Sequence, residues 1–332
     1  MRALLRWIGV LFLCGIVAVG LAVGWLANAA YRDRSYPSVQ TRVVIPRGST
    51  FSEVARELAR AGVIGNVVSF RLLARLRGEE TGVHAGEYRF DPHLTQSDVL
   101  ESLQTGGAQV AAWVSIPEGF TAREIAARLG EAGIGSADAY ARAFARDTVV
   151  AGGRRTKSLE GFLFPSTYLI ALGATPEQVE SELTGEFFAK LPHDAAARAR
   201  RLGVTVPQAV TVASLIEREA KADADRPLIA GVIYNRLRVR MPLEVDATIE
   251  YALPEHKSEL SFADLRIDSP YNTYTHDGLP PTPIANPGLP SLEAALSPSK
   301  TDFLYYVYCG NGRHAFAKTL SEHQANVARC LR

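Results

Sequence analysis

Two glutamates, Glu217 and Glu219, lie near the end of a stretch rich in Ala, Leu, Glu and Arg. Pro207 precedes this stretch and suits the first turn of a helix, where its missing N–H would have no partner in any case. We therefore predict a helix over 208–221. A carboxylate on an apolar helix, close to segments rich in Asn, Tyr and Thr, has the properties of a general acid that acts on a sugar.

Helix geometry does not choose between the two glutamates. Residues two positions apart point about 200° from each other around a helix, so only one of them can face a given pocket. Each glutamate has apolar neighbours on its own side, and such surroundings favour the protonated form that a general acid needs. The alternative is an ordinary pair of surface glutamates neutralised by Arg218, Lys221 or other cations.

Polar and aromatic segments follow the predicted helix. A second helix is predicted over 227–237, and a short extended piece over 243–246 ends in a carboxylate, Asp246. The stretch 269–288 contains too much proline for a helix or a central strand, and a long ordered loop inside a compact domain is usually functional. Its Asn, Thr and Tyr side chains suit the recognition of hydroxyl and acetamido groups.

Four side chains are our candidates for contact with a saccharide, because a purely structural role does not demand so many polar groups in one region. They are Tyr271, Asn272, Tyr274 and His314. The last of them belongs to a hairpin predicted from strands over 303–308 and 314–316. For each of the four, the alternative is a role in capping or bracing the fold.

Composition and motifs exclude several classes of protein. A formal net charge of +1 gives no sign of a nucleic-acid partner. The histidines and cysteines show no HExxH or CxxC spacing, and neither a Gly-x-Ser-x-Gly elbow nor a phosphate loop occurs. We therefore predict no metal and no cofactor. Cys309 and Cys330, near the C-terminus, can form a disulfide only if the compartment is oxidising and the fold places them close to each other.

The beginning of the chain has the properties of a membrane anchor. Trp7 to Ala27 is an unbroken apolar run of 21 residues, about the length that a helix needs to cross ~30 Å of hydrocarbon. We predict a cytoplasmic tail over 1–6, a transmembrane helix over 7–30 and a linker over 31–42, with the body of the protein extracytoplasmic. A cleaved signal peptide is the alternative, although its apolar region usually has only ~7–15 residues.

A short pattern occurs twice after the linker. Residues 43–48 and 114–119 each form a predicted strand and a Pro-x-Gly turn, followed by a Thr with Glu three residues on, the signature of a capping box at a helix start. Between the copies we predict a helix over 69–76, a strand over 86–90 and a helix over 96–104. A strand, two helices and another strand are typical of small peptidoglycan-binding modules; a structural adaptor without a ligand is the alternative.

The remaining segments predict a larger domain that mixes helices with a few strands. A Gly-Gly pair at 106–107 marks the boundary between the two domains. Further helices are predicted over 135–151, 176–191, 291–296 and 319–331. The fold class is therefore α+β.

Several blocks of the sequence, taken together and in this order, resemble the endolytic murein transglycosylase family, also called YceG-like. They are ASLIERE at 213–219, NRL at 235–237, YNTY and GLPP within 271–281, and HAF at 314–316 with His323. The resemblance covers nearly everything after the linker. It implies a single transmembrane helix, a small LysM-like βααβ domain over 43–110 and an α+β catalytic domain over 111–332.

The resemblance also implies an activity and a site. Such an enzyme cuts within peptidoglycan strands at the β-1,4 bond from N-acetylmuramic acid to N-acetylglucosamine, without water, and leaves a 1,6-anhydro end. By position, Glu217 matches the catalytic residue of the family. One carboxylate suffices, because the muramyl 6-hydroxyl is the nucleophile, whereas ordinary glycosidases need two. An anchored enzyme of this kind would terminate new strands or set their length at the inner membrane, near wall-synthesis proteins.

Two other functions fit the same sequence. A hydrolytic muramidase would use Glu217 together with Asp246 as its second carboxylate. A non-catalytic scaffold would bind peptidoglycan through the small repeated module and would recruit wall-synthesis proteins at the membrane.

Overall fold

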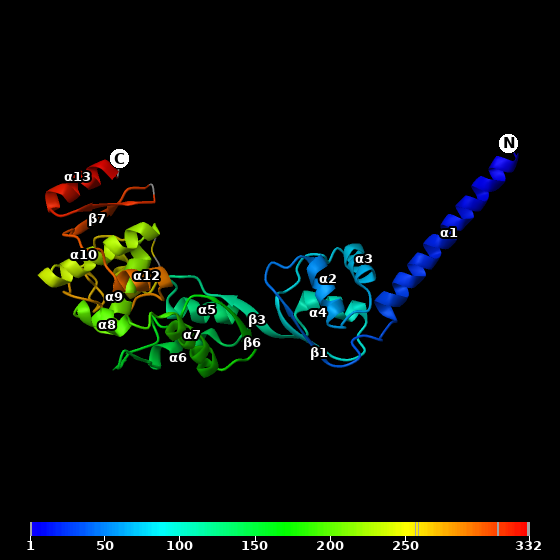
Figure 1. Cartoon of the computed structure of the whole chain (residues 1–332), viewed down its shortest axis with the longest axis horizontal. Helices are drawn as coiled ribbons and strands as arrows, with labels where there is room; N and C mark the ends of the chain where they lie inside the picture. Colours follow the sequence, from blue (N-terminus) through cyan, green and yellow to red (C-terminus); the bar gives the residue numbers. More distant parts are fainter. Residues whose placement is uncertain (1, 256, 258, 311, 331–332) are drawn as a thin grey trace. The chain divides into compact units, whose positions relative to one another are not determined.

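A computed structural model describes residues 2–255, 257, 259–310 and 312–330, with side chains described from Trp7 onward (Figure 1). The chain divides into two compact units, and each is described by itself. One unit contains Met1–Trp113 and Leu169–Gly173, and the other contains Val114–Tyr168 and Ala174–Arg332. Strands β3 (Gln109–Ser115) and β6 (Thr167–Ala171) each have residues in both units.

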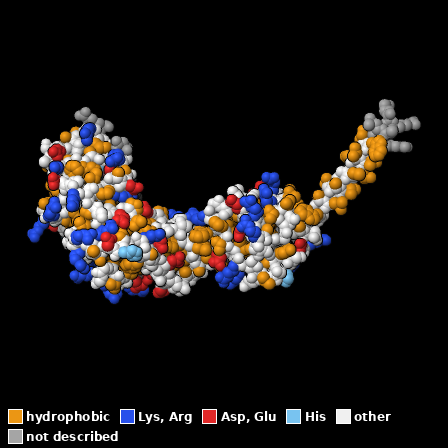
Figure 2. All heavy atoms as spheres, viewed as in Figure 1, with side chains coloured by type: hydrophobic (Ala, Val, Ile, Leu, Met, Phe, Trp, Pro, Cys, Tyr) orange, Lys and Arg blue, Asp and Glu red, His pale blue; other side chains and the backbone are white. Residues whose placement is uncertain are grey.

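Helix α1 (Arg2–Tyr31) begins the first unit. Its segment Trp7–Tyr31 has a mean hydropathy of 2.5 and is the one helix of the described chain that is long and apolar enough to cross a membrane, properties that a signal sequence shares. Hydrophobic side chains cover it along its length (Figure 2). Only its end packs against the unit, where Ala30 is buried and the Tyr31 hydroxyl accepts a hydrogen bond from Arg77 at 3.2 Å.

The rest of the first unit follows the predicted order of strand, two helices and strand. Its elements are β1 (Thr41–Ile45), α2 (Phe51–Arg60), α3 (Val67–Arg77), β2 (Gly86–Phe90) and α4 (Gln96–Thr105). The sheet has the order β1-β2-β3-β6, and β2 is antiparallel to both of its neighbours. Phe70, Tyr88 and Phe90 are fully buried in its core. The LysM-like character of this unit stays a prediction.

Both copies of the repeated pattern start a helix as expected. In each copy the threonine oxygen accepts from the backbone N–H three residues on, and the glutamate there binds back to the threonine N–H. The two boxes are Thr50 with Glu53 at α2, and Thr121 with Glu124 at α5 (Ala122–Glu131). These starts are local in sequence, so they can be read from the sequence without knowledge of the fold.

The second unit is built around one buried helix, α9 (Val206–Glu219), which contacts four neighbouring helices. These are α8 (Ala195–Arg201), α10 (Arg226–Val239), α11 (Asp246–Ala252) and α12 (Leu289–Leu296). The helices α6 (Ala137–Arg146) and α7 (Pro176–Lys190) lie between α5 and these elements in the chain. Two single-turn 3-10 helices, η1 (Asp223–Asp225) and η2 (Asp264–Arg266), connect the others.

Some predicted boundaries are wrong: the helix predicted over 208–221, for example, is α9, which ends at Glu219. The helix predicted over 135–151 ends at Arg146, because Asp147 has extended backbone angles. Further on, Gly152 and Gly153 have φ of 56° and 79° and form a tight turn between β4 (Val150–Ala151) and β5 (Arg154–Arg155). The piece predicted as extended over 243–246 is not extended throughout, because Glu244 has a left-handed φ of 51° and Asp246 already begins α11. Residues 269–288 form no helix or strand, as predicted.

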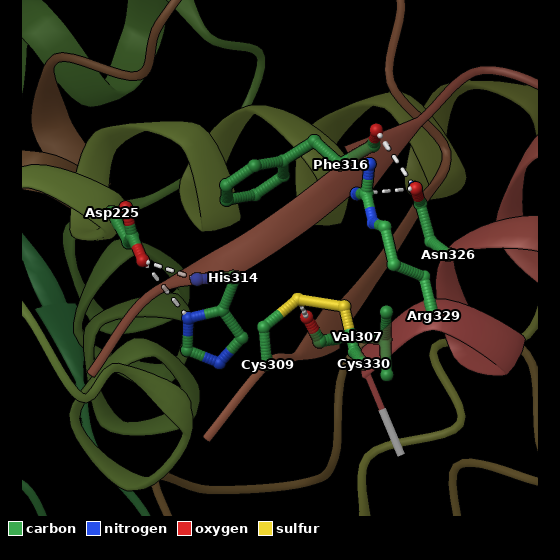
Figure 3. Close-up of a disulfide and its surroundings, with 8 residues drawn as sticks. All are labelled: Asp225, Val307, Cys309, His314, Phe316, Asn326, Arg329 and Cys330. Atoms are coloured by element: carbon green, nitrogen blue, oxygen red, sulfur yellow. Dashed lines mark hydrogen bonds and ion pairs between the residues drawn. A yellow bond between two sulfur atoms is a disulfide. The ribbon is translucent and has the colours of Figure 1, made fainter. Parts of the chain in front are cut away.

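The unit ends with a hairpin and a helix. Strands β7 (Tyr305–Tyr308) and β8 (His314–Ala317) pair antiparallel, and α13 (Leu320–Cys330) packs against both. Cys309 and Cys330 form a disulfide with an S–S distance of 1.98 Å, which joins the end of β7 to the end of α13 (Figure 3). Asn311, which lies between the two predicted strands of the hairpin, and Leu331, the predicted end of the last helix, lie outside the described residues.

Candidate active site

The last turn of α9 carries both glutamates. The helix starts at a capping box between Thr205 and Gln208, and its middle is buried on every side. It stops at Glu219 because the next residue, Ala220, has extended backbone angles. A helix held by packing on all sides fixes the direction of its last side chains. Glu217 and Glu219 therefore point into two different environments.

Glu217 is held by an ion pair and a backbone hydrogen bond. Arg226 donates to one carboxylate oxygen at 3.2 Å, and the Gly288 N–H donates to the other at 2.9 Å. The side chain of Glu217 is only 6% exposed. Arg226 also donates to Asp223 at 3.0 Å and to Ser291. The expectation of apolar surroundings is therefore wrong for Glu217, since its partners come from segments that a helix wheel does not include.

A third carboxylate, Glu118, lies in the same corner and was missed by the sequence analysis. It sits in the Pro-Glu-Gly turn of the second repeat, and a Cβ on Gly288 would collide with its carboxyl group. Burial raises the pKa of Glu118, and the charge of Glu217 raises it further. The only available signal was the turn itself, which sequence reasoning had assigned to the start of α5.

Glu219 faces a cleft of about 500 Å³. The Tyr306 hydroxyl donates to its carboxyl group at 3.0 Å. Burial raises the pKa of Glu219 to about 7, and the charge of Asp246 adds to this shift, whereas the Tyr306 hydrogen bond and Lys221 act against it. A carboxyl group with a pKa near neutrality can be protonated in one step of a reaction and ionised in the next.

The cleft brings together residues from α9, α11, loop 269–288, the β7–β8 hairpin and α13. Besides Glu219, the side chains that matter here are Asp246, Tyr274, Tyr306, His314 and His323. The Tyr274 hydroxyl donates to Asp246, so that loop 269–288 is tied to the start of α11. Two of the four predicted saccharide contacts, Tyr274 and His314, therefore lie beside Glu219 and not beside Glu217.

The other two predicted contacts lie deeper. The Tyr271 hydroxyl is 2.8 Å from the Thr282 hydroxyl, and its ring packs on Tyr251. Asn272 is fully buried and donates to the carbonyl oxygens of Leu265 and Ile267 at 3.1 and 2.9 Å. These interactions brace the loop. Direct contact of either residue with a saccharide stays a prediction.

A buried network that the sequence analysis missed holds the segment before α12. Glu160 accepts hydrogen bonds from the Ala122 N–H at 3.0 Å, the Asn286 amide at 2.9 Å and the Tyr251 hydroxyl at 3.2 Å. Burial raises the pKa of Glu160 to about 7. Asn286 lies two residues before Gly288, so this network also places the N–H that binds Glu217.

Asp225 and His314 form a further pair beside the cleft (Figure 3). Asp225 is fully buried, and one of its oxygens accepts from the His314 backbone N–H at 2.8 Å and lies 3.1 Å from Nδ1 of the same residue. Within the described part of the chain, no three or more His, Cys, Asp or Glu side chains are arranged to hold a metal ion. The absence of a cofactor stays a prediction.

Comparisons with known proteins agree with one another. A model of the YceG-like family matches residues 43–329. A Bacillus subtilis (strain 168) protein named endolytic murein transglycosylase is 34% identical over an alignment of 294 residues, and the match covers 84% of this chain and 81% of that protein. A Streptococcus pneumoniae protein of the same name is 32% identical over 320 residues, and the match spans 57% of its length. A solved structure of a yceG-like protein from Listeria monocytogenes is 33% identical, covers 86% of this chain and has a TM-score of 0.63.

Proposed function

This chain belongs to the YceG-like family, and from that membership we propose that it is an endolytic peptidoglycan lytic transglycosylase. Its substrate is the glycan strand, which it cuts at the β-1,4 bond from N-acetylmuramic acid to N-acetylglucosamine to leave a 1,6-anhydro end. The names of relatives at 32–34% identity over most of the chain support the reaction. The observation that supports a site for it is a half-buried carboxyl group in a cleft, Glu219, with a pKa of about 7.

Glu219 would serve as both acid and base. In its protonated form it donates a proton to the glycosidic oxygen, which leaves as the 4-hydroxyl of N-acetylglucosamine while the C1–O bond breaks. The muramyl 6-oxygen bonds to C1, and its proton passes to the carboxylate of Glu219, which regains its starting form. No water is consumed, and a single carboxyl group with a pKa near the working pH can perform both transfers.

Glu217 is the alternative acid, because it matches the family's catalytic residue by position in the resemblance. Its surroundings favour a different role. Both of its oxygens already accept hydrogen bonds, from Arg226 and from the Gly288 N–H, and the ion pair is almost fully buried. A proton transfer at this carboxylate would require the ion pair to open first. We therefore assign Glu217 to holding the last turn of α9, and we assign the chemistry to Glu219.

A hydrolytic muramidase is the second candidate function, and one observation favours it. Asp246 lines the same cleft as Glu219, so two carboxyl groups are available there, as ordinary glycosidases require. Its tie to Tyr274 limits the freedom of Asp246 to activate a water. In the hydrolytic reading Glu219 replaces Glu217 as the partner of Asp246.

Location follows from the N-terminal helix. We propose that α1 is retained as a single-pass anchor in the inner membrane, with the N-terminus cytoplasmic and both folded units outside. The disulfide between Cys309 and Cys330 supports an oxidising compartment for the second unit. An anchored enzyme acts on strands near the membrane, where new glycan emerges, and this favours a role in ending new strands beside wall-synthesis proteins.

The products of digestion test the reaction. Purified full-length protein is incubated with peptidoglycan, and the released fragments are analysed by mass spectrometry. Fragments with 1,6-anhydro ends, each lighter than the hydrolytic product by one water, support the lytic reaction. Reducing ends support the muramidase, and Asp246→Asn should then abolish them. Binding to peptidoglycan without any released fragment favours the scaffold.

A further inference from the structure

Asp225 is a buried charged group of the second unit that has no role in the proposed reaction. Asp225 has no exposed surface, yet its carboxylate is fully supplied with hydrogen-bond donors. Arg313 donates to one oxygen at 3.0 Å, and the other oxygen accepts from the His314 backbone and faces its Nδ1. Burial alone would raise the pKa of Asp225, but the hydrogen bonds from His314 and Arg313 outweigh it and lower the pKa. The group is therefore an ionised carboxylate.

An ionised carboxylate determines which nitrogen of the neighbouring imidazole carries the proton. A carboxylate can only accept hydrogen bonds, so the 3.1 Å contact requires Nδ1 of His314 to be the donor. In the neutral ring the other nitrogen, Nε2, then has a free lone pair and acts as an acceptor. In Figure 3 the Nδ1 edge of the ring faces Asp225, and Nε2 lies on the opposite edge.

The ring is also held in orientation. Tyr306 lies edge-on to the imidazole with ring centres 5.7 Å apart, and Tyr308 lies at 5.5 Å on a neighbouring position of the hairpin. The side chain of His314 is 3% exposed and lines the cleft of Glu219. Tyr306 is the residue that donates to Glu219, so the histidine and the acid share a neighbour.

Besides His314, the neutral side-chain groups of the cleft that can accept a hydrogen bond are the His323 imidazole and the tyrosine hydroxyls. The cations of the cleft, Arg218, Lys221 and Arg236, can only donate hydrogen bonds. Asp246 is already bound by Tyr274, and Glu219 is reserved for the reaction. In the Nδ1–H tautomer, Nε2 of His314 adds an acceptor for a sugar hydroxyl that enters this cleft as a donor.

We propose that Asp225 is a positioning residue, which holds His314 as the Nδ1–H tautomer so that Nε2 accepts a hydrogen bond from a hydroxyl of the bound glycan. The proposal rests on the proposed function for its ligand, a saccharide in the Glu219 cleft. It extends that function by a residue that touches no substrate and acts through another side chain. The serine-protease triad shows the same physics, since changing its buried Asp to Asn reverses the histidine tautomer and leaves the geometry intact.

The tautomer can be measured without any substrate. Nitrogen-15 spectra of the full chain labelled at histidine report which ring nitrogen of His314 carries the proton, and His314→Ala identifies its signals. The wild type should show protonated Nδ1 and bare Nε2. Asp225→Asn, whose amide can donate to Nδ1, should shift His314 toward the Nε2–H form. A wild type with Nε2–H would overturn the proposal, whatever the activity.

Kinetics separate positioning from a purely structural role. Asp225→Asn and His314→Ala should each raise KM for glycan strands about three- to tenfold, the worth of one hydrogen bond, with kcat within about twofold. Asp302→Asn, at an exposed carboxylate that pairs with Lys318, is the control and should leave KM unchanged. If Asp225→Asn and His314→Ala both keep the wild-type KM, or lose kcat only in proportion to a lowered melting temperature, Asp225 merely braces the hairpin.

The proposed function and the proposed role of Asp225 can fail separately. If the wild type releases no anhydro product while its tautomer is the one expected, the proposed function fails and the histidine acts on another ligand. If anhydro product forms and the tautomer is Nε2–H, the function stands and the role of Asp225 is wrong. Should Asp225→Asn not fold, the wild-type spectrum and the KM of His314→Ala still decide.

Discussion

The two sides of the last turn of α9 carry the same residue type in opposite settings. On one side, Glu217 is nearly buried in an ion pair with Arg226 and also accepts the Gly288 N–H. On the other side, Glu219 lines an open cleft and accepts a hydrogen bond from a phenol, the Tyr306 hydroxyl. The two glutamates are separated by one residue and by about 200° around the helix axis.

The difference shows that partners, and not residue type, decide what a carboxyl group does. A carboxylate whose two oxygens accept hydrogen bonds from fixed donors holds its neighbours in place, but it does not readily take up or release a proton. A carboxyl group that burial raises to a pKa of about 7 exchanges its proton easily near neutral pH. We therefore expect changes on the Glu219 side to alter activity and its pH dependence, and changes on the Glu217 side to alter stability.

For the unaltered protein, the largest effect on activity should come from pH. Activity requires Glu219 to begin protonated, and the protonated fraction falls tenfold for each pH unit above its pKa of about 7. At about pH 9, kcat/KM should therefore be roughly 100-fold below its maximum. The groups that face this carboxyl group are Tyr306, Asp246, Lys221 and Glu250. A profile of kcat/KM between about pH 5 and pH 9 checks the sign, and a rate that stays flat or rises across this range contradicts it.

Arg226→Ala should have the largest effect on stability. The change leaves the Glu217 carboxylate nearly buried without its cation, which costs about 3 kcal/mol of the free energy of unfolding. Arg146→Ala is the matched control, because its pair with Asp147 is exposed and should contribute less than about 1 kcal/mol. Denaturant unfolding of the full chain measures both. Equal losses of unfolding free energy in the two variants would mean that the Arg226–Glu217 ion pair does not stabilise the last turn of α9.

Tyr306→Phe should move the pH profile rather than abolish activity. The hydroxyl stabilises the ionised form of Glu219, so removing it raises the pKa of Glu219. The fall of kcat/KM at high pH (the alkaline limb of the profile) should then move to higher pH by about one unit. Tyr234→Phe removes a comparable hydroxyl, which donates to the Ala295 carbonyl, and should leave the limb in place. A shift of the alkaline limb to lower pH in Tyr306→Phe would show that the Tyr306 hydroxyl does not bind the Glu219 carboxylate.

Removing α1 should have the smallest effect. A fragment that begins near residue 28 keeps buried Ala30 and the bond between Tyr31 and Arg77, whereas one that begins at Arg34 loses both. The second fragment should be less stable by about 1 kcal/mol in the first unit and should cut glycan as fast as the first. Loss of cutting in both fragments would mean that the apolar helix does more than anchor the chain.

The parts of the fold that depend on near neighbours could be predicted from the sequence. The capping boxes at Thr50 and Thr121 involve residues three positions apart, and both occur as expected. The choice between Glu217 and Glu219 could not be made, because it depends on partners distant in sequence. Tyr306 lies 87 residues from Glu219, and Gly288 lies 71 residues from Glu217.

The candidate loop shows the same limit. Its richness in polar side chains indicated function, yet Asn272 uses its amide on the backbone of its own region. Tyr274, two residues later, reaches the cleft. Composition identified the segment, and only the packing of the loop separates the side chains that brace it from those that face a ligand.

One pair of variants decides whether Glu219 or Glu217 is the general acid. Glu219→Gln and Glu217→Gln are compared with the wild type in a single assay that counts 1,6-anhydro ends, with melting temperatures measured alongside. We expect Glu219→Gln to fold normally and to lose about 100- to 10,000-fold in turnover, the usual contribution of a general acid. Glu217→Gln should be less stable and should keep turnover within about tenfold of the wild type at a temperature where it is folded. A folded Glu217→Gln without activity, beside an active Glu219→Gln, would contradict the account.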